Sequence, residues 1–396
     1  MANNFEFYSP TRVVFGKETE QQVGKLVREY GGSRVLVVYG GKSAIRSGLL
    51  EKVKTALRRE KIYAAELGGV VPNPHLQKVY EGIQIGKAEQ IDFLLAVGGG
   101  SVIDTAKAIA YGLAEPETDV WELYAHTRTA KRCLPVASVL TIAAAGSETS
   151  KGSVITNEET HEKRAYDDDL VRPKFAIMNP ALTATLPDYQ TESGCADIMM
   201  HTMERYFTNG GNMDITDALA EGLLRTVMKN AKILHKDPEN YDARAEVMWS
   251  GSLAHNDLTG CGNNGGDFMS HQLEHELGGM FDVTHGAGLA AIWPNWARHV
   301  YRDCLPRFVK FARNVMGVAE DGSDEEIALR GIAAMEDFYH SVGMPVNLRE
   351  LGIHPTDAQI REMAERCLKA CGAHTGSAKK LTLEDMIAIY NAANAN

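Results

Sequence analysis

The chain has 396 residues, more than one hydrophobic core usually organises, so we expect two domains. Hydrophobic residues make up 44% and charged residues 23%, as in an ordinary globular protein. The 41 basic and 52 acidic side chains give a net charge of −11 with no basic tract, which argues against nucleic acid or an acidic membrane as the main partner.

The chain starts with MANNFEFYSP, which lacks the positive segment and apolar core of a signal peptide. No apolar run anywhere in the sequence is long enough to cross a bilayer. Residues 5–16, FEFYSPTRVVFG, alternate apolar and polar side chains, and this pattern predicts an antiparallel hairpin at a sheet edge.

The first half of the chain alternates strand-like and helix-like segments. The predicted strands lie in residues 34–40, 91–100, 133–148 and 173–180, with amphipathic stretches between them. Near-continuous apolar strands separated by helices predict a parallel sheet covered on both faces. We therefore predict an α/β dinucleotide-binding domain over 1–187, in which the acidic run AYDDDL (165–170) forms a solvated loop.

After Pro187 the strand-like runs nearly vanish. Helices are predicted over 191–208, 214–234, 242–258, 266–279, 325–342, 357–371 and 382–394. These segments predict an all-helical second domain, 188–396. The cysteines at 133, 195, 261, 304, 367 and 371 are scattered and suggest no disulfide framework, so a reducing cytoplasm is the expected location.

The segment LLAVGGGSVIDTAK (94–107) has the order strand, glycine turn, helix. Gly98, Gly99 and Gly100 let the backbone approach a ligand closely, and Ser101 opens the helix, whose free N–H groups and positive dipole end attract phosphate. Asp104 cannot bind phosphate, so we expect it to hold the loop or to contact another part of the cofactor. In a β-α context this segment favours a dinucleotide, although it lacks the G-x-G-x-x-G fingerprint.

The end of the predicted strand RVLVVYGGKS bears on the choice of dinucleotide. Enzymes selective for NAD usually place a carboxylate here against the ribose 2′-hydroxyl. This chain offers Gly40, Gly41, Lys42 and Ser43, and a lysine with a hydroxyl can hold a 2′-phosphate. NADP is therefore the expected cofactor, with NAD as the alternative.

Five side chains of the second half have the spacing of metal ligands. Asp197 and His201 lie four apart in a predicted helix, as do His271 and His275, so each pair shares a helix face. His285 follows a glycine-containing break and precedes a glycine, as a loop ligand often does. One carboxylate with imidazoles suits a first-row divalent ion, Fe(II) or Zn(II), better than an all-oxygen Mg²⁺ or Ca²⁺ site.

The stretch HQLEH (271–275) also fits the H-x-x-E-H pattern of zinc peptidases, with Glu274 as the base. That interpretation leaves Asp197, His201 and the whole nucleotide half unexplained. It ranks below a nucleotide-dependent metal enzyme.

Taken together, the motifs resemble those of the iron-containing alcohol dehydrogenase family, and of its NADP-dependent butanol dehydrogenase and aldehyde reductase branch in particular. The resemblance rests on GGGSVIDTAK (98–107), AAAGSETS (143–150), NPALTATLP (179–187), DIMMHTMERY (197–206) and HQLEHELGGMFDVTHGAGLA (271–290). It implies a dehydroquinate-synthase-like fold, with a metal in the cleft between an α/β domain and an all-α domain, and a homodimer or larger homo-oligomer.

The resemblance also implies roles for single residues. The family's metal ligands fall on Asp197, His201, His271 and His285, and His275 matches a non-ligand histidine near the nicotinamide that is a candidate proton relay. Glu274 stands where relatives often have a small residue. AAAGSE lacks the threonine of the commoner family form, and Thr141 just upstream is the candidate to replace its cofactor contact.

We therefore expect reversible hydride transfer between NADP(H) and a primary alcohol or aldehyde such as butanol or butanal. The alternatives are a dehydroquinate-synthase-like or glycerol-dehydrogenase-like enzyme, the zinc peptidase, and a silent nucleotide-binding protein. The expected partner is a small molecule, without nucleic acid or membrane.

Overall fold

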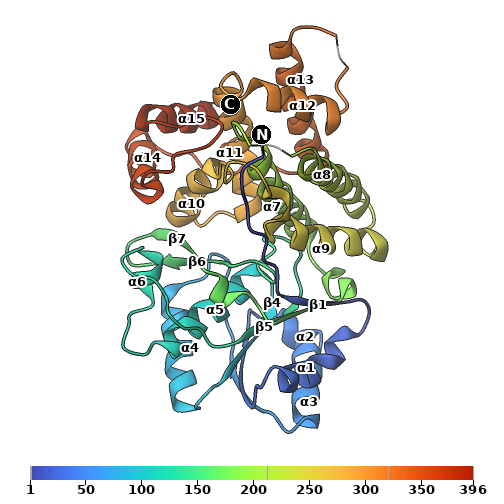
Figure 1. The fold of residues 1–396 in the computed structure, drawn as a ribbon, viewed down its shortest axis with the longest axis vertical. Helices are drawn as coiled ribbons and strands as arrows, with labels where there is room; N and C mark the ends of the chain where they lie inside the picture. The colour runs from blue at the N-terminus through green and yellow to red at the C-terminus, as the bar shows by residue number, and fades with distance from the viewer. Residues whose placement is uncertain (1, 212, 320, 396) are drawn as a thin grey trace. The chain divides into compact units, whose positions relative to one another are not determined.

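The computed structural model describes residues 2–211, 213–319 and 321–395. The chain divides into two compact units, Ser9–Thr185 on one hand and Met1–Tyr8 with Leu186–Asn396 on the other (Figure 1). The predicted domains, 1–187 and 188–396, differ from this division chiefly in the first eight residues.

The α/β unit is built on a six-stranded sheet. Its strands are β1 (Arg12–Phe15), β2 (Arg34–Tyr39), β3 (Tyr63–Leu67), β4 (Phe93–Gly98), β5 (Val136–Leu140) and β8 (Phe175–Met178). Their order across the sheet is β1-β8-β5-β4-β2-β3, and every neighbouring pair is parallel. The predicted parallel sheet is thus confirmed.

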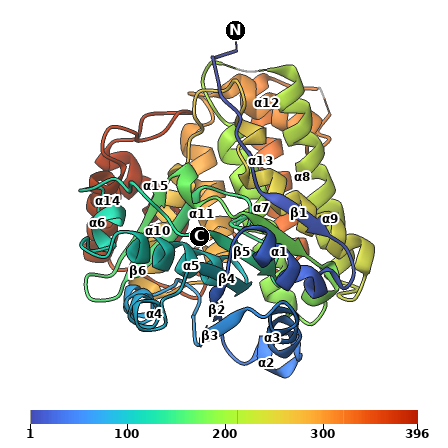
Figure 2. The same cartoon turned by 60° about the horizontal axis from the view of Figure 1, so that its bottom comes forward.

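Helices cover both faces of this sheet (Figure 2). The helices of this unit are α1 (Val23–Glu29), α2 (Ser43–Arg46), α3 (Leu49–Arg59), α4 (Leu76–Ala88), α5 (Gly100–Ala114) and α6 (Trp121–Tyr124), of which α1 and α3 lie on one face of the sheet and α4 and α5 on the other. Apolar residues of α1 and α3 pack on the face that presents Val35, Leu95 and Ile177. Because alternate residues of a strand point to opposite faces, Leu36 and Leu94 face the other way, toward the side of α4 and α5, and they too are fully buried.

The antiparallel hairpin predicted for residues 5–16 is wrong. Only β1 is a strand in this stretch, and it pairs in parallel with β8. Phe5 and Phe7 are 52% and 43% exposed, so their alternation does not bury a face. Pro10, which has no N–H to donate to a sheet, separates them from β1.

The acidic run at 165–170 is also more ordered than predicted. Residues up to Asp167 belong to β7 (Glu162–Asp167), which pairs antiparallel with β6 (Gly152–Asn157) in a ribbon that the sequence did not reveal. Asp168 caps a short 3-10 helix, Asp169–Val171, by accepting a hydrogen bond from the Leu170 N–H.

The second unit has helices and loops but no strand among its described residues, which confirms the predicted all-helical class. Its helices are α7 (Asp188–Tyr206), α8 (Asp214–Leu234), α9 (Tyr241–His255), α10 (Met269–Phe281), α11 (His285–Val300), α12 (Leu305–Asn314), α13 (Asp324–Ser341), α14 (Asp357–Cys371) and α15 (Leu383–Ala395). Across the described part of the chain, every helix is too short or too polar to span a bilayer.

Two of these helices, α11 and α12, were not predicted. Residues 286–297 of α11 are all buried, so the helix has no polar face to reveal its period, and it contains Pro294. His285 is accordingly the first residue of a helix and not a loop residue, which corrects the expectation from the adjoining glycine.

Candidate active site

The predicted nucleotide residues meet at one edge of the parallel sheet. Strands β2 and β4 are neighbours, and Tyr39 at the end of β2 pairs with Val97 of β4, so Gly40 and Gly98 follow side by side. From β2 the chain continues to β3 on one side, whereas from β4 it continues to β5 on the other. This reversal of strand order is the place where open α/β sheets bind ligands, outside the carboxyl ends of the strands.

The glycine turn after β4 leaves space only for backbone. A Cβ atom on Gly98 would lie 2.5 Å from the Val102 side chain, and one on Gly99 would lie 2.9 Å from Ile142. Gly100 and Ser101 open α5, and among the described residues nothing accepts a hydrogen bond from their N–H groups. Two free donors at a helix N-terminus fit the phosphates of a dinucleotide.

Asp104 faces protein groups. Its carboxylate accepts hydrogen bonds from the Ser147 hydroxyl at 2.6 Å and from the Val154 N–H at 3.0 Å. These contacts support its predicted role in holding the loop. Thr141 follows β5 directly, and its N–H donates to the Gly98 carbonyl at 3.0 Å, which places it beside the glycine turn.

Lys107 is a further part of this network that sequence reasoning missed. It is fully buried, and its ammonium donates to the Ser147 hydroxyl at 3.0 Å and to the Ser150 and Gly152 carbonyls at 3.0 and 2.7 Å. Burial lowers the pKa of Lys107 to about 8, against the raising effect of Asp104. The signal was its position three residues after Asp104, on the same face of α5.

The predicted 2′-phosphate residues lie at the start of the next helix. Gly41, Lys42 and Ser43 are exposed where the chain passes from β2 into α2. A cation and a hydroxyl are therefore accessible at the sheet edge that also carries the glycine turn.

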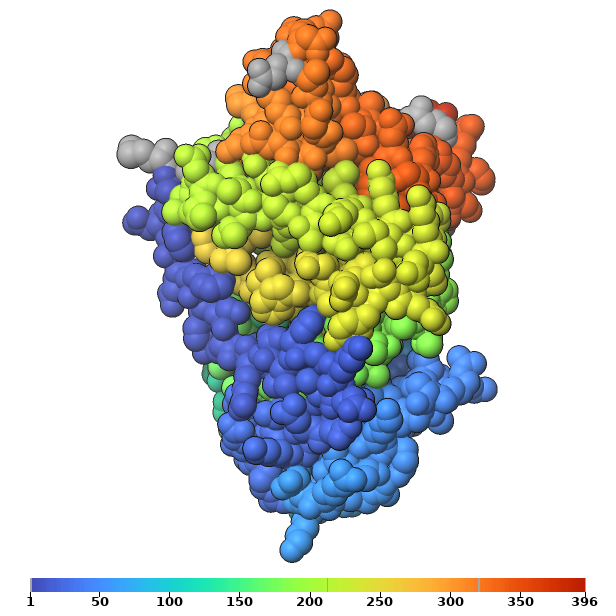
Figure 3. Space-filling view, turned by 90° about the vertical axis from the view of Figure 1, so that its right-hand side faces the viewer, coloured from blue at the N-terminus to red at the C-terminus, as the bar shows by residue number. Residues whose placement is uncertain are grey.

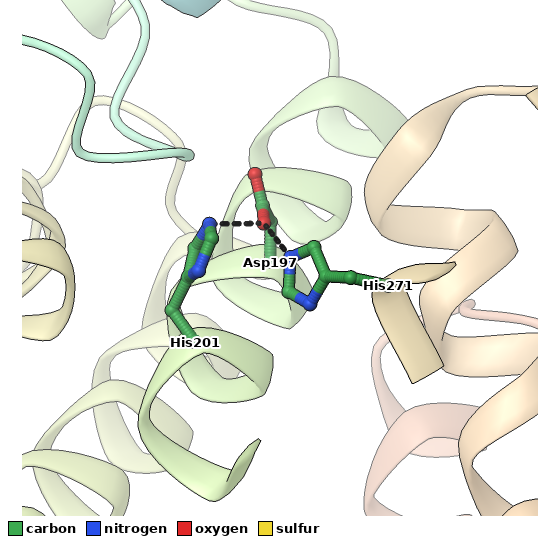
Figure 4. Close-up of side chains that lie close together, drawn as sticks. All are labelled: Asp197, His201 and His271. Carbon is green, nitrogen blue, oxygen red and sulfur yellow. Dashed lines mark ion pairs between the residues drawn. The ribbon is translucent and has the colours of Figure 1, made fainter. Parts of the chain in front are cut away.

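The helical unit brings the predicted metal ligands together. Asp197 and His201 lie on α7, His271 on α10 and His285 at the start of α11. Candidate ligand atoms of the first three lie within 4.8 Å of one another (Figure 4). The Nε2 atoms of the three histidines lie 3.3, 3.7 and 3.8 Å from the same oxygen, Oδ1 of Asp197. Ligands of a tetrahedral ion at about 2.1 Å are roughly 3.4 Å apart, so these spacings suit a shared ion.

Several polar atoms of the predicted metal ligands are buried without a hydrogen-bond partner. Asp197, His201 and His271 are all at most 6% exposed. Within the described chain, Asp197 Oδ1 and His271 Nε2 are buried without a hydrogen-bond partner. Because a buried polar atom normally has a partner, these unsatisfied atoms indicate that the residues fit a bound cation.

Two buried carboxylates orient the imidazoles from behind. Glu204 pairs with Nδ1 of His271 and also accepts from the His271 N–H at 3.1 Å, and Glu274 pairs with Nδ1 of His285. Each pairing leaves Nε2 facing Asp197. Such outer carboxylates fix the tautomer and direction of ligand histidines. Sequence reasoning missed Glu204, although it lies on α7 two turns after Asp197.

His201 and His271 differ in their affinity for protons. Burial lowers the pKa of His201 well below its usual value, with His255 and His271 acting in the same direction. Burial also opposes protonation of His271, but Glu204 and Asp197 outweigh it and raise its pKa to about 9. A divalent cation would take the place of the proton between His271 and Asp197.

The peptidase interpretation does not suit this arrangement. Glu274 is fully buried and pairs with His285, whereas a peptidase base must reach a water on the metal. His275 is 5% exposed, and its ring centroid lies 5.8 Å from that of His285.

Comparison with known proteins shows the family to which the chain belongs. The model of the iron-containing alcohol dehydrogenase family matches residues 10–180, and the model of the C-terminal domain of the same family matches residues 191–394. The chain belongs to the iron-containing alcohol dehydrogenase family. Relatives include NADH-dependent butanol dehydrogenase A of Clostridium acetobutylicum, 39% identical with 98% of each chain covered. Another is the NADPH-dependent aldehyde reductase YqhD of Escherichia coli, 35% identical over 99% of this chain and 100% of the relative.

Solved structures extend this similarity to the fold. The crystal structure of NADH-dependent butanol dehydrogenase A from Thermotoga maritima superposes with a TM-score of 0.95, at 37% identity and with 99% of each chain covered. As a member of this iron-containing alcohol dehydrogenase family, the chain is an oxidoreductase that acts on alcohols, and the family uses a nicotinamide cofactor and a divalent metal.

Glu274 gives a prediction specific to this alcohol dehydrogenase. Replacing it with alanine releases Nδ1 of His285 and should weaken metal binding by roughly 10- to 100-fold, the usual effect of losing an outer carboxylate. Competition of the purified variant with a chromogenic chelator measures this affinity. Glu274→Gln, which keeps an acceptor oxygen, should recover part of the loss; equal metal affinity in wild type and both variants would contradict the orienting role.

Proposed function

We propose that this enzyme transfers hydride reversibly between NADP(H) and a primary alcohol or aldehyde such as butanol or butanal. The observation that carries the proposal is the cluster of three imidazoles around one oxygen of Asp197. Two of the relatives are named as a butanol dehydrogenase and an aldehyde reductase, and these names support primary alcohols and aldehydes as the substrate class.

The chain's own residues divide the work. Asp197, His201, His271 and His285 would hold the divalent metal, with Fe(II) or Zn(II) suiting this donor set. When bound, the metal supplies Lewis acidity toward the substrate oxygen and the nicotinamide supplies or accepts hydride. We assign the proton relay to His275, which has a candidate ligand atom within 4.8 Å of those of Glu274 and His285 and so stands beside the proposed metal ligands.

The preference for NADP rests on the end of β2. The residues there include an exposed lysine and a serine and no carboxylate, so a 2′-phosphate meets a cation and a hydroxyl. The N–H groups of Gly100 and Ser101 would bind the pyrophosphate. The names of the relatives divide between NADH and NADPH, so the preference must come from this chain's own residues.

We also propose a homodimer or larger homo-oligomer in a reducing cytoplasm. All six cysteines are free, which agrees with reducing surroundings. A dehydroquinate-synthase-like or glycerol-dehydrogenase-like reaction stays second, because the relatives above are butanol dehydrogenases and an aldehyde reductase.

The test uses protein prepared without oxygen. We expect about one divalent metal per chain and butanal-dependent loss of NADPH absorbance, with kcat/KM at least about 10-fold higher for NADPH than for NADH. Loss of activity on chelation and recovery with Fe(II) or Zn(II) complete the expected result. Activity that survives complete removal of the metal would contradict the metal assignment.

Variants at the end of β2 test the cofactor preference independently of the metal assignment. Lys42→Ala should lower kcat/KM for NADPH about 10- to 100-fold and change that for NADH by less than about 3-fold, since only the 2′-phosphate contact is lost. Lys25→Ala, at an exposed lysine of α1, is the matched control and should change neither value. Equal losses with both cofactors would refute the NADP preference and leave the reaction itself standing.

A further inference from the structure

A second group of potential metal ligands lies on the same helical unit, away from the first. Asp188 and Glu192 lie four residues apart on α7, and His235 is the C-cap residue of α8. One ligand atom of each lies within 4.8 Å of the others, and His235 Nδ1 is 3.0 Å from Asp188 Oδ2. Asp188 precedes Asp197 by nine residues, about 13 Å along the helix axis, so one ion cannot serve both groups.

Glu192 is the unusual member of this group. Its side chain is fully buried, and neither carboxylate oxygen has a hydrogen-bond partner in the described part of the chain. Burial raises the pKa of Glu192 to about 8, and the charge of Asp188 adds to this effect, whereas the charge of Arg244 opposes it. A buried carboxylate without a partner is costly, and proteins normally satisfy one with a hydrogen bond, a counter-charge or a metal.

Arg244 on α9 is the nearby cation that would ordinarily fill this role. Its Nε donates to the Pro238 carbonyl at 2.8 Å and its Nη1 to the Thr191 hydroxyl at 2.9 Å. Between the described residues there is no ion pair from Arg244 to Glu192, and Nη2 of Arg244 has no acceptor. The guanidinium is thus held by α7 and the α8–α9 connection, and the Glu192 carboxylate faces Asp188 and His235 instead.

We propose that Asp188, Glu192 and His235 form an accessory site for a first-row divalent cation, with Zn²⁺ as the best match. Two carboxylates and one imidazole are ligands that Zn²⁺ accepts, with water at the remaining position. The Asp188 and His235 side chains are 51% and 36% exposed, so an ion can enter from solvent while Glu192 binds it from the buried side. The C-terminal end of α8, where His235 lies, also favours a cation.

Such an ion would tie the first turn of α7 to the last turn of α8. These two helices pack against each other, and α8 and α9 form much of the face seen in Figure 3. Because α7 also carries Asp197 and His201, the accessory ion would fix the helix that supplies half of the first ligand set. Its expected effect is on stability, and the chemistry at the first centre does not require it.

The test counts bound Zn²⁺ in the full-length protein. After chelator treatment, reloading with Zn²⁺ and desalting, we expect about two Zn²⁺ per wild-type chain and about one in each of His235→Ala and Glu192→Gln. His340→Ala is the matched control, because His340 is also exposed beside a carboxylate, Glu350 at 3.1 Å, and should keep about two. His235→Ala should retain wild-type activity to within about 2-fold.

A His271→Ala background makes the result independent of the first centre. We expect about one Zn²⁺ per chain in His271→Ala and none in the His271→Ala, His235→Ala double variant. Zn²⁺ should raise the melting temperature of His271→Ala but not that of the double variant. Unchanged Zn²⁺ content in both His235→Ala and Glu192→Gln would overturn the proposal. If Glu192 pairs instead with Arg244, Glu192→Gln will alter stability without altering the Zn²⁺ count, which also overturns it.

Discussion

Asp197→Asn should empty the metal centre and lower kcat by about 10³-fold or more. Oδ1 of Asp197 is the oxygen that all three histidine Nε2 atoms approach, so the substitution removes the charge at the middle of the set. Loss of a catalytic metal removes several kcal/mol of transition-state stabilisation, and about 4 kcal/mol corresponds to roughly 10³-fold in rate. Metal analysis and steady-state kinetics on the same preparation measure both effects.

Asparagine keeps the volume of the buried side chain, so circular dichroism should show an intact helical unit. Asp214→Asn, at an exposed residue in the first turn of α8, is the control and should keep both metal and rate. A variant that retains the metal and works within about 10-fold of the wild-type rate would show that Asp197 is not the central ligand.

Ser101→Asp should abolish tight cofactor binding without destabilising the protein. The new carboxylate would stand in the first turn of α5, where the free N–H groups of Gly100 and Ser101 are proposed to bind pyrophosphate. Repulsion between the two anions should cost about 2–3 kcal/mol, or roughly 30- to 150-fold in the Kd for NADPH. An acidic residue near a helix N-terminus is itself favourable by about 0.3–1 kcal/mol, so stability should hold or rise.

This pairing of effects separates binding from folding. Fluorescence titration with NADPH and a thermal melt of the unliganded protein measure the two quantities. The asparagine of Ser101→Asn has the same size as the aspartate of Ser101→Asp but no charge, so its Kd for NADPH should lie within about 5-fold of the wild-type value. If Ser101→Asp binds NADPH as tightly as Ser101→Asn, the phosphates lie elsewhere.

The core strands of the sheet could be predicted because they are buried on both faces. Runs such as FLLAVG in β4 have no polar position, and glycines end them abruptly. The β6–β7 ribbon escaped notice because its strands mix charged and apolar residues, and Lys163 and Arg164 are buried despite their charge. The hairpin predicted for residues 5–16 was wrong for the opposite reason. Phe5 and Phe7 alternate with polar residues as in a strand, but they pair with no strand of the described chain and are exposed.

Spacing could indicate five candidate metal residues, since helix geometry places residues four apart on one face, but the choice of Asp197, His201, His271 and His285 among them came from the resemblance to the family. Their outer partners could not be predicted. Glu204 reaches His271 across 67 positions, and only the tertiary structure brings these residues of α7 and α10 together. Glu274 was visible in the sequence but suggested a catalytic base, because the pattern does not tell which neighbour its carboxylate meets. Lys107 was hidden similarly, as its acceptors are the Ser147 hydroxyl and the backbone carbonyls of Ser150 and Gly152, 40 to 45 positions away.

The place of β1 in the sheet has a consequence for biosynthesis. β1 leaves the ribosome before the other strands of the six-stranded sheet, yet its neighbour in that sheet is β8, about 160 positions later. At roughly 5–20 residues per second, β1 waits on the order of 8–30 s for that neighbour to be translated. The sheet therefore cannot close until nearly the whole nucleotide half has been made, and the unpaired β1 segment is exposed to aggregation and to chaperones during this interval.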